Sequence, residues 1–199
     1  MEARSRRDQY SEETRSTLLA SARHLFAERG YAGTSIEDVV GRAGMTRGAL
    51  YHHFASKKDI FEAVFEDLER ELMERVAGAG TGEADVWTRI MTSLHAFLDG
   101  CLEPTCRRIA LQEAPMVLGR DRWREIDERY AMGLVRGGVE ELIDAGVIAS
   151  QPVDLLAHIL FGALTEAAFR VAAADEPAAA RDEAAALLER MVGSLRIDR

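Results

Sequence analysis

Residues 30–61, GYAGTSIEDVVGRAGMTRGALYHHFASKKDIF, carry the clearest structural signal in the chain. Ser35 is a helix-capping residue type followed by two acidic side chains, and Gly44 favours the left-handed backbone that ends a helix in a tight turn. Thr46 then caps a second short helix over residues 47–54. Two short helices joined by a glycine-containing turn form a helix-turn-helix. The stretch therefore predicts a module whose second helix enters the major groove of DNA.

The start of that second helix carries the groups expected to meet base edges. The guanidinium of Arg47 can donate two hydrogen bonds to guanine, which is the commonest specific contact in the major groove. Gly48 has no side chain, so it lets the backbone approach the bases closely. Together with Thr46, these residues form the predicted reading end of the helix.

The remaining sequence predicts helices throughout and no strand. Alternation of apolar and polar residues never persists beyond four or five positions, whereas apolar residues repeatedly recur three or four apart. The four prolines fall at or near the expected boundaries, and Glu113–Pro115 is interpreted as a helix end. The fold class predicted is therefore all-α. Besides the helix-turn-helix, the expected helices cover residues 11–29, 56–76, 84–102, 105–117, 122–145, 153–174 and 178–195.

Charge is divided unevenly along the chain. Residues 1–58 contain ten Lys or Arg and seven Asp or Glu, whereas residues 59–199 contain 15 and 27, so the net charge of −9 conceals a basic N-terminal part. This asymmetry indicates a basic module joined to an acidic one, although a few extra arginines need not have a function.

Composition places the chain among ordinary globular proteins. Of its 199 residues 47% are hydrophobic and 30% charged, and no apolar run approaches the roughly 20 residues of a membrane span. The charged N-terminus lacks the apolar stretch of a signal peptide. Cys101 and Cys106 are the only cysteines, which fits a reducing compartment. We therefore expect a cytoplasmic protein with no membrane partner.

The residues quoted above resemble the DNA-binding domain of TetR-type transcriptional regulators. The segments ALYHHF (49–54) and SKKDIF (56–61) are the most diagnostic, and the resemblance covers residues 12–65. Beyond them it rests on the all-helical pattern and total length. The resemblance implies a homodimeric, ligand-responsive regulator that binds double-stranded operator DNA. The function expected is that of a repressor released from a palindromic operator by a small, largely apolar effector.

This resemblance also implies a division into parts. We expect a flexible tail at residues 1–10, a three-helix head at 11–58, and a C-terminal bundle at 59–199 for effector binding and dimerisation. A linking helix at 56–76 would connect the last two parts. In the tail, Arg4, Arg6 and Arg7 either reach the DNA backbone or minor groove, or are simply solvated.

Carried over to this sequence, the family pattern implies two sets of DNA contacts. Those expected to hold phosphates are Thr34 or Ser35, Tyr51, His53 and Lys57. Those expected to face the groove are Thr46, Arg47, Gly48 and His52, the last at a position where the family usually has Tyr. Tyr51 could equally be a core aromatic. A metal site at the adjacent histidines is disfavoured because neighbours on a helix point about 100° apart.

The last two expected helices carry more apolar surface than one protein core needs. The helix at 153–174 is apolar around much of its circumference, and its alanines permit close approach of another helix. We expect these two helices to form the interface between two copies; the alternative is a core helix of a monomer. The expected interface residues are Leu156, Ile159, Leu160, Ala163, Ala167, Leu187, Leu188, Met191 and Leu195.

The middle helices are expected to surround an effector cavity. Ligand pockets are mostly apolar with a few placed polar groups, and this part of the sequence combines the two, although such stripes also form ordinary core. The expected lining residues are Met91, Leu94, His95, Leu98, Met116, Trp123, Tyr130, Phe161 and Thr165.

No arrangement of nucleophile and base, and no paired carboxylates in a catalytic context, occurs in the sequence. The two cysteines lack further thiols or a histidine for a zinc site. We therefore expect neither an enzyme nor a cofactor or metal. The competing interpretation is a helical carrier of small molecules or lipids with a vestigial DNA-binding head.

Overall fold

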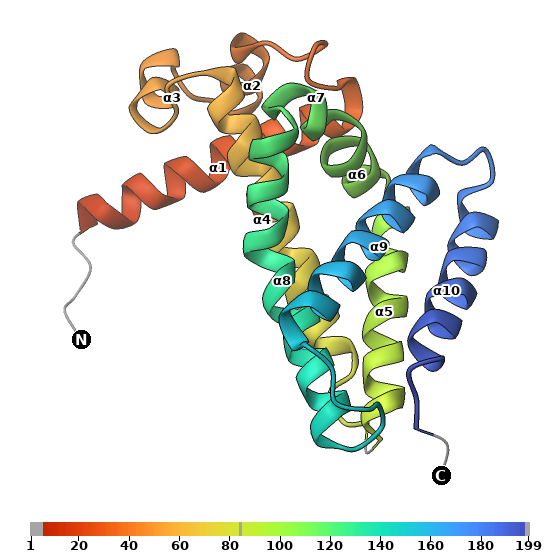
Figure 1. The fold of residues 1–199 in the computed structure, drawn as a ribbon. Coiled ribbons are helices and arrows are strands. Elements are labelled where there is room, and N and C mark those ends of the chain that lie inside the picture. Colours follow the sequence, from red (N-terminus) through yellow and green to blue (C-terminus); the bar gives the residue numbers. More distant parts are fainter. Residues whose placement is uncertain (1–5, 84, 198–199) are drawn as a thin grey trace.

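The chain folds into a helical head and a longer helical bundle (Figure 1). The structure is a computed structural model that describes residues 6–83 and 85–197. Over these residues it contains no strand, only one isolated bridge between Ile148 and Arg196. The predicted all-α fold is confirmed. The elements are α1 (Arg6–Arg29), α2 (Ile36–Ala43), α3 (Arg47–His53), α4 (Lys57–Ala79), α5 (Val86–Leu102), α6 (Pro104–Cys106), η1 (Arg107–Glu113), α7 (Ala114–Leu118), α8 (Arg120–Asp144), α9 (Val153–Ala173) and α10 (Pro177–Gly193).

The head consists of α1, α2 and α3 packed on the first turns of α4. Phe26, Leu50 and Phe61 are fully buried between these helices, and the rings of Phe26 and Phe61 meet edge to face at 5.1 Å. The turn between α2 and α3 ends α2 at Gly44, whose φ of 65° is the left-handed backbone expected from its sequence. The helix-turn-helix is therefore built as predicted.

The bundle consists of α5, α8, α9 and α10 around the C-terminal half of α4. The 23-residue helix α4 leaves the head, runs alongside α8, and packs on α5 (Figure 1). Its buried residues run without interruption from Ile60 in the head to Val76 in the bundle. One continuous helix therefore belongs to both parts.

Most helix ends lie within three residues of the expected positions, but two expectations were wrong. α1 begins at Arg6, so residues 6–10 are helical rather than part of a flexible tail, because no Pro or Gly before Gly30 interrupts the helix. Arg4 lies outside the described residues. Residues 105–117 do not form one helix but parts of three, of which η1 is a π-helix. η1 ends at Glu113, as predicted for Glu113–Pro115, but α7 follows at once with Pro115 in its first turn.

The helix α9 is long and apolar enough to cross a membrane by length and composition alone, although Asp154, Glu166 and Arg170 interrupt its apolar residues, as the absence of a long apolar run predicted. Core helices of globular proteins pass the same test. In the fold α9 packs against α8 on one side and α10 on the other. It is therefore a helix of the bundle, whose apolar surface is only partly covered within one chain.

Candidate DNA-binding surface and ligand cavity

The recognition helix α3 presents one buried and one open face. Leu50 is fully buried beneath it, whereas Arg47, Gly48 and His52 are exposed. Tyr51 is 54% exposed, which excludes the alternative of a core aromatic. Thr46 caps the helix, since its Oγ1 accepts a hydrogen bond from the Ala49 N–H at 3.2 Å. The residues predicted to face the groove thus share the open face.

Arg47 is not free in this structure. Its guanidinium forms an ion pair with the carboxylate of Glu37 on α2, and both side chains are more than half exposed. An exposed pair of this kind contributes little, about 0–1 kcal/mol, to stability. The guanidinium can therefore exchange Glu37 for a stronger partner such as a guanine edge.

The residues predicted to hold phosphates differ in accessibility. Ser35 caps α2: its Oγ accepts a hydrogen bond from the Asp38 N–H at 3.1 Å, and it remains half-buried at the helix N-terminus. Thr34 does not fit its predicted role, because its side chain is only 1% exposed and its Oγ1 donates to the Gly30 carbonyl at 2.9 Å. Burial, together with nearby His52 and Arg15, lowers the pKa of half-buried His53, which favours a neutral ring near pH 7.

Lys57 is engaged inside the head. Its Nζ donates to the carbonyls of Tyr31 and Thr34, both at 2.9 Å, and lies 4.2 Å from the centre of the Tyr31 ring. The ammonium therefore fixes the loop between α1 and α2. An ammonium has three N–H donors, so one remains for the predicted phosphate contact while two hold the loop.

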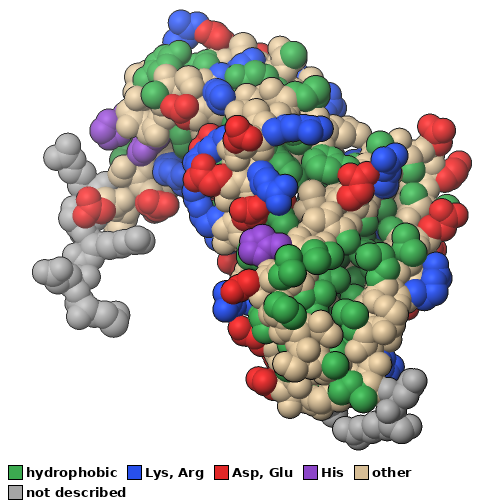
Figure 2. Space-filling view, viewed as in Figure 1, with side chains coloured by type: hydrophobic (Ala, Val, Ile, Leu, Met, Phe, Trp, Pro, Cys, Tyr) green, Lys and Arg blue, Asp and Glu red, His purple; other side chains and the backbone are tan. Residues whose placement is uncertain are grey.

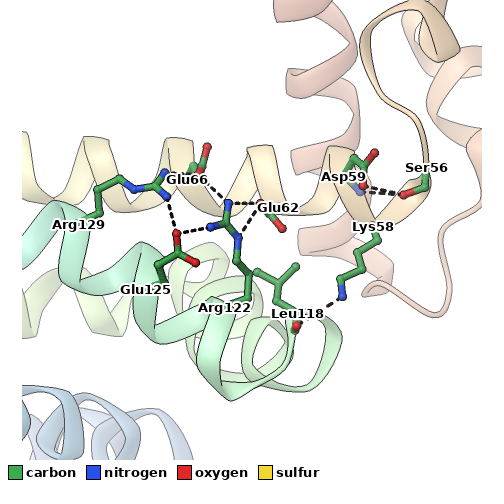
Figure 3. Close-up of polar contacts among 9 residues, drawn as sticks. All are labelled: Ser56, Lys58, Asp59, Glu62, Glu66, Leu118, Arg122, Glu125 and Arg129. Carbon is green, nitrogen blue, oxygen red and sulfur yellow. Dashed lines mark hydrogen bonds and ion pairs between the residues drawn. The ribbon is translucent and has the colours of Figure 1, made fainter.

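Two sets of polar contacts join the head to the bundle. In the first, Arg122 of α8 contacts Glu62 of α4 at 2.6 Å, and Arg129 contacts Glu66 at 2.9 Å (Figure 3). Lys58 extends this set, donating to the Leu118 carbonyl at the end of α7 at 3.4 Å. These contacts tie the upper half of α4 to the bundle.

The second set reaches the turn after α1. Glu113 at the end of η1 accepts a hydrogen bond from the Tyr31 N–H at 2.8 Å. Arg108, also in η1, donates to the carbonyls of Ala27 and Glu28 at 3.1 and 3.0 Å. A Cβ atom at Gly30, whose φ is 76°, would lie 2.4 Å from the Glu113 carboxylate. We call these contacts of Arg108 and Glu113 the α1 latch; they were not predicted from the sequence.

The bundle encloses a cavity of about 290 Å³ between α4, α5, α8, α9 and α10. Its walls are mainly aliphatic and aromatic side chains, as expected of a ligand pocket. The expected residues that line it are Met91, Leu94, Phe161 and Thr165.

Two residues of α5 predicted to line the cavity lie elsewhere. His95 pairs with Glu189 of α10, bridging the two helices. Leu98 is fully buried in a separate core cluster with Ala185 and Leu188. Both lie on the side of α5 that faces α10, a rotation that helical periodicity alone does not fix.

Three further predicted lining residues are also absent from the main cavity. Met116 is 77% exposed on α7. Trp123 is buried, donates its Nε1–H to the Ala110 carbonyl at 3.0 Å, and lines only a smaller hollow beside the cavity. Tyr130 packs against the main core.

Two carboxylates near the cavity, one buried and one half-buried, were not predicted. Asp127 of α8 lines the main cavity, and both it and Glu69 of α4 line the smaller hollow. Burial raises the pKa of each carboxyl group, and their proximity raises that of Glu69 further. A signal was available: Glu69 follows Phe65 by four residues and precedes Leu72 by three, so it lies within an apolar stripe. Asp127 likewise follows Trp123 by four.

Apolar side chains remain uncovered on α9 and α10. Ile159 is 56% exposed, Leu187 52% and Met191 41%. Hydrophobic side chains gather over the surface of α9 (Figure 2). Leu188 alone among the expected interface residues is buried in its own bundle, at 4% exposure. The half-buried members are Leu156, Leu160, Ala163, Ala167 and Leu195.

Both parts of the chain match known protein families. Residues 18–64 match the bacterial regulatory proteins of the tetR family, and residues 87–195 match the tetracyclin repressor-like C-terminal domain. A TetR-family transcriptional regulator from Pectobacterium atrosepticum has a similar crystal structure, with 37% identity, a TM-score of 0.86, and coverage of 98% of this chain and 99% of that one.

Other relatives are more distant or match less of the chain. The TetC protein of transposon Tn10 from Escherichia coli is 28% identical over 162 residues, 81% of this chain and 82% of that protein. The repressor KstR2 of Rhodococcus jostii is 37% identical over 139 residues, 64% and 66% of the two chains. The crystal structure of RolR with resorcinol has a TM-score of 0.72 at 25% identity, covering 93% of this chain and 90% of that one.

Proposed function

The chain belongs to the TetR family of DNA-binding transcriptional regulators, and we propose that it is a repressor released from a palindromic operator by a small, largely apolar effector. The family consists of regulators rather than enzymes. The observation that carries the proposal is α4, one helix that is packed in the head at Ile60 and lines the cavity at Met73 and Val76. A regulator of genes acts where the DNA is, so the expected cytoplasmic location is part of the proposal.

DNA contact is assigned to the open face of α3 and the N-terminus of α2. Arg47, Gly48 and His52 would face base edges, with Thr46 at the helix start. Ser35, Tyr51 and His53 would hold phosphates, since hydroxyl, imidazole and helix N-terminal N–H groups suit them. Thr34 is left out because it is buried, whereas Lys57 would contact a phosphate with the N–H that does not hold the loop.

The exposed apolar surface of α9 and α10 supports a homodimer. Ile159, Leu187 and Met191 would be covered by the same helices of a second copy, a self-complementary arrangement. A two-fold dimer places two α3 helices for two half-sites one helical turn of DNA apart, about 34–36 Å. A palindromic operator follows from that symmetry.

The cavity supports an effector of modest size. Its volume of about 290 Å³ is near the lower end of the range of small-molecule pockets, about 300–1,000 Å³. The structure of RolR with resorcinol shows that a protein of this fold holds a small ligand.

Coupling would run through the two connections between bundle and head. An effector that binds one conformation better would shift α4 and change the spacing of the two α3 helices. The α1 latch would carry the same shift to the turn after α1. By linkage, operator DNA must then weaken effector binding by the same factor; equal effector affinity of free and operator-bound protein would contradict this mechanism.

The first test is binding to the DNA that flanks the chain's own gene, titrated at two salt concentrations. We expect saturable, sequence-dependent binding that weakens steeply with salt, and a loss of about 1–3 kcal/mol for Arg47→Ala. Arg70→Ala is the matched control, since it removes an exposed arginine of α4 that pairs only within its own helix. If no operator is found there, selection of bound fragments from the whole genome follows. A carrier with a vestigial head would select none.

A further inference from the structure

The inner end of the cavity is acidic. Glu69 is only 6% exposed, and no hydrogen bond or ion pair to it is found among residues 6–83 and 85–197; since these residues include no fully buried polar side-chain atom without a partner, its oxygens open onto the hollow. Asp127 receives one weak hydrogen bond, from the Thr165 hydroxyl at 3.5 Å. Buried carboxylates are ordinarily paired with a cation or held by several donors. Here Glu69 and half-buried Asp127 have few protein partners, and their oxygens are open to the hollow, where a ligand can reach them.

The two acids surround a hollow that continues the main cavity. The hollow, of about 20 Å³, shares Phe97, Asp127 and Thr165 with the main cavity, whereas Glu69 lines the hollow alone. A space of this size holds one water molecule, or one group of similar size such as an ammonium. The main cavity beyond it is apolar.

No basic side chain balances these acids from within the walls that the structure describes. Arg89 is the one basic residue that lines the main cavity, and it is already paired with Glu141 at 2.7 Å. The other titratable groups near the pair are the buried thiols of Cys101 and Cys106, and on α8 the charges of Glu128 and Arg124, which oppose each other. The site is left with an excess of negative charge when its acids ionise.

We propose that the effector is a cation: a largely apolar molecule with one protonated amine, whose ammonium group occupies the hollow between Glu69 and Asp127. This assignment rests on the proposed function, since it specifies the ligand of the same cavity. An ammonium replaces the missing partner of both carboxylates, while the apolar remainder fills the main cavity. An anionic ligand is repelled by the same groups.

The test compares three probes that share one apolar body: 4-phenylbutylamine, 4-phenylbutan-1-ol and 4-phenylbutyrate. Binding is measured by calorimetry at pH 7 on the whole protein without DNA. We expect the amine to bind about tenfold or more tightly than the alcohol, and the carboxylate not to bind. The amine should also release protons, seen as heats that differ between buffers, because a facing cation lowers the pKa of the acids.

Variants assign the preference to the two acids. Glu69→Gln and Asp127→Asn should bring the affinities for amine and alcohol close together while alcohol binding persists, which also shows that the variants fold. Glu140→Gln, an exposed change on α8, should keep the preference.

Three results would overturn the proposal: an alcohol that binds as tightly as the amine, a preference that survives both substitutions, or no binding of any probe. Proton uptake when the amine binds, in place of release, would also contradict the proposal, because it would show that the ligand accepts a hydrogen bond from the protonated Glu69 and Asp127. Operator binding is measured separately, so its failure would contradict the proposed function and leave these results standing.

Discussion

The α1 latch predicts a measurable loss of stability when Glu113 is replaced by Ala. The Glu113 side chain is 19% exposed, and its Oε2 accepts from the Tyr31 N–H at 2.8 Å. Removing it deletes a charge-assisted hydrogen bond and leaves a half-buried N–H without its partner, which costs about 1.5–3 kcal/mol. The ion pair with Arg108, at 3.7 Å and 37% exposed, adds at most about 0.5 kcal/mol. We therefore expect a loss of about 2–3 kcal/mol.

Urea unfolding followed by far-ultraviolet circular dichroism measures this loss, at one fixed protein concentration because a dimer's stability depends on it. Glu113→Gln keeps an acceptor oxygen for Tyr31 and loses only the charge, so it should cost about 1 kcal/mol. Glu74→Ala is the control: its pair with Arg70 is exposed, and its removal should change the unfolding free energy by less than about 0.5 kcal/mol.

The ordering of the three variants decides the outcome. If Glu113→Ala unfolds within about 0.5 kcal/mol of the unaltered protein at an unchanged m-value, the carboxylate does not hold the turn. If Glu113→Gln is as damaging as Glu113→Ala, the charge and not the acceptor to Tyr31 carries the effect, and the reasoning from the hydrogen bond is wrong.

Two further predictions concern the bundle. Burial raises the pKa of Asp127 in the folded state, so the stability that its protonated form contributes is complete below the unfolded pKa near 4 and is lost as the pH rises. Between pH 5 and pH 8 the variant Asp127→Asn should therefore be about 1–3 kcal/mol more stable than the unaltered protein. A difference in unfolding free energy that does not depend on pH would contradict this prediction. Leu187→Glu should convert the dimer to monomers in sedimentation at micromolar concentration, because Leu187 is a 52% exposed apolar residue of the proposed interface, whereas Met116→Glu on α7 should leave the sedimentation unchanged.

The boundaries of α2 and α3 were predictable because local chemistry sets them. Ser35 and Thr46 accept the backbone hydrogen bonds expected of helix caps, and Gly44 adopts the expected left-handed backbone. These interactions span three or four residues, so the sequence contains both partners. The open face of α3 follows from the same local pattern, since burying Leu50 turns Arg47 and Tyr51 outward.

The roles of individual polar residues were less predictable because their partners are distant in the sequence. Lys57 has the expected position but donates to the loop carbonyls of Tyr31 and Thr34, more than 20 residues earlier. His95 meets Glu189 of the neighbouring helix α10, 94 residues later in the sequence. Periodicity shows that a helix has an apolar face, whereas the packing of five helices decides which part of that face borders a cavity.

Because η1 is wound as a π-helix, α-helical spacing in the sequence could not predict the α1 latch. In an α-helix, residues five apart are rotated by about 140° from one another, so Arg108 and Glu113 would point to different sides. A π-helix bonds each residue to the fifth beyond it and brings such pairs to one side, where both reach the end of α1. The same segment borders the hollow through Leu111 and α9 through the bond from Gln112 to the Ala172 carbonyl. A ligand in the hollow that drew η1 toward α-helical winding would therefore turn Glu113 away from Tyr31, and this would connect the hollow to the DNA-binding head.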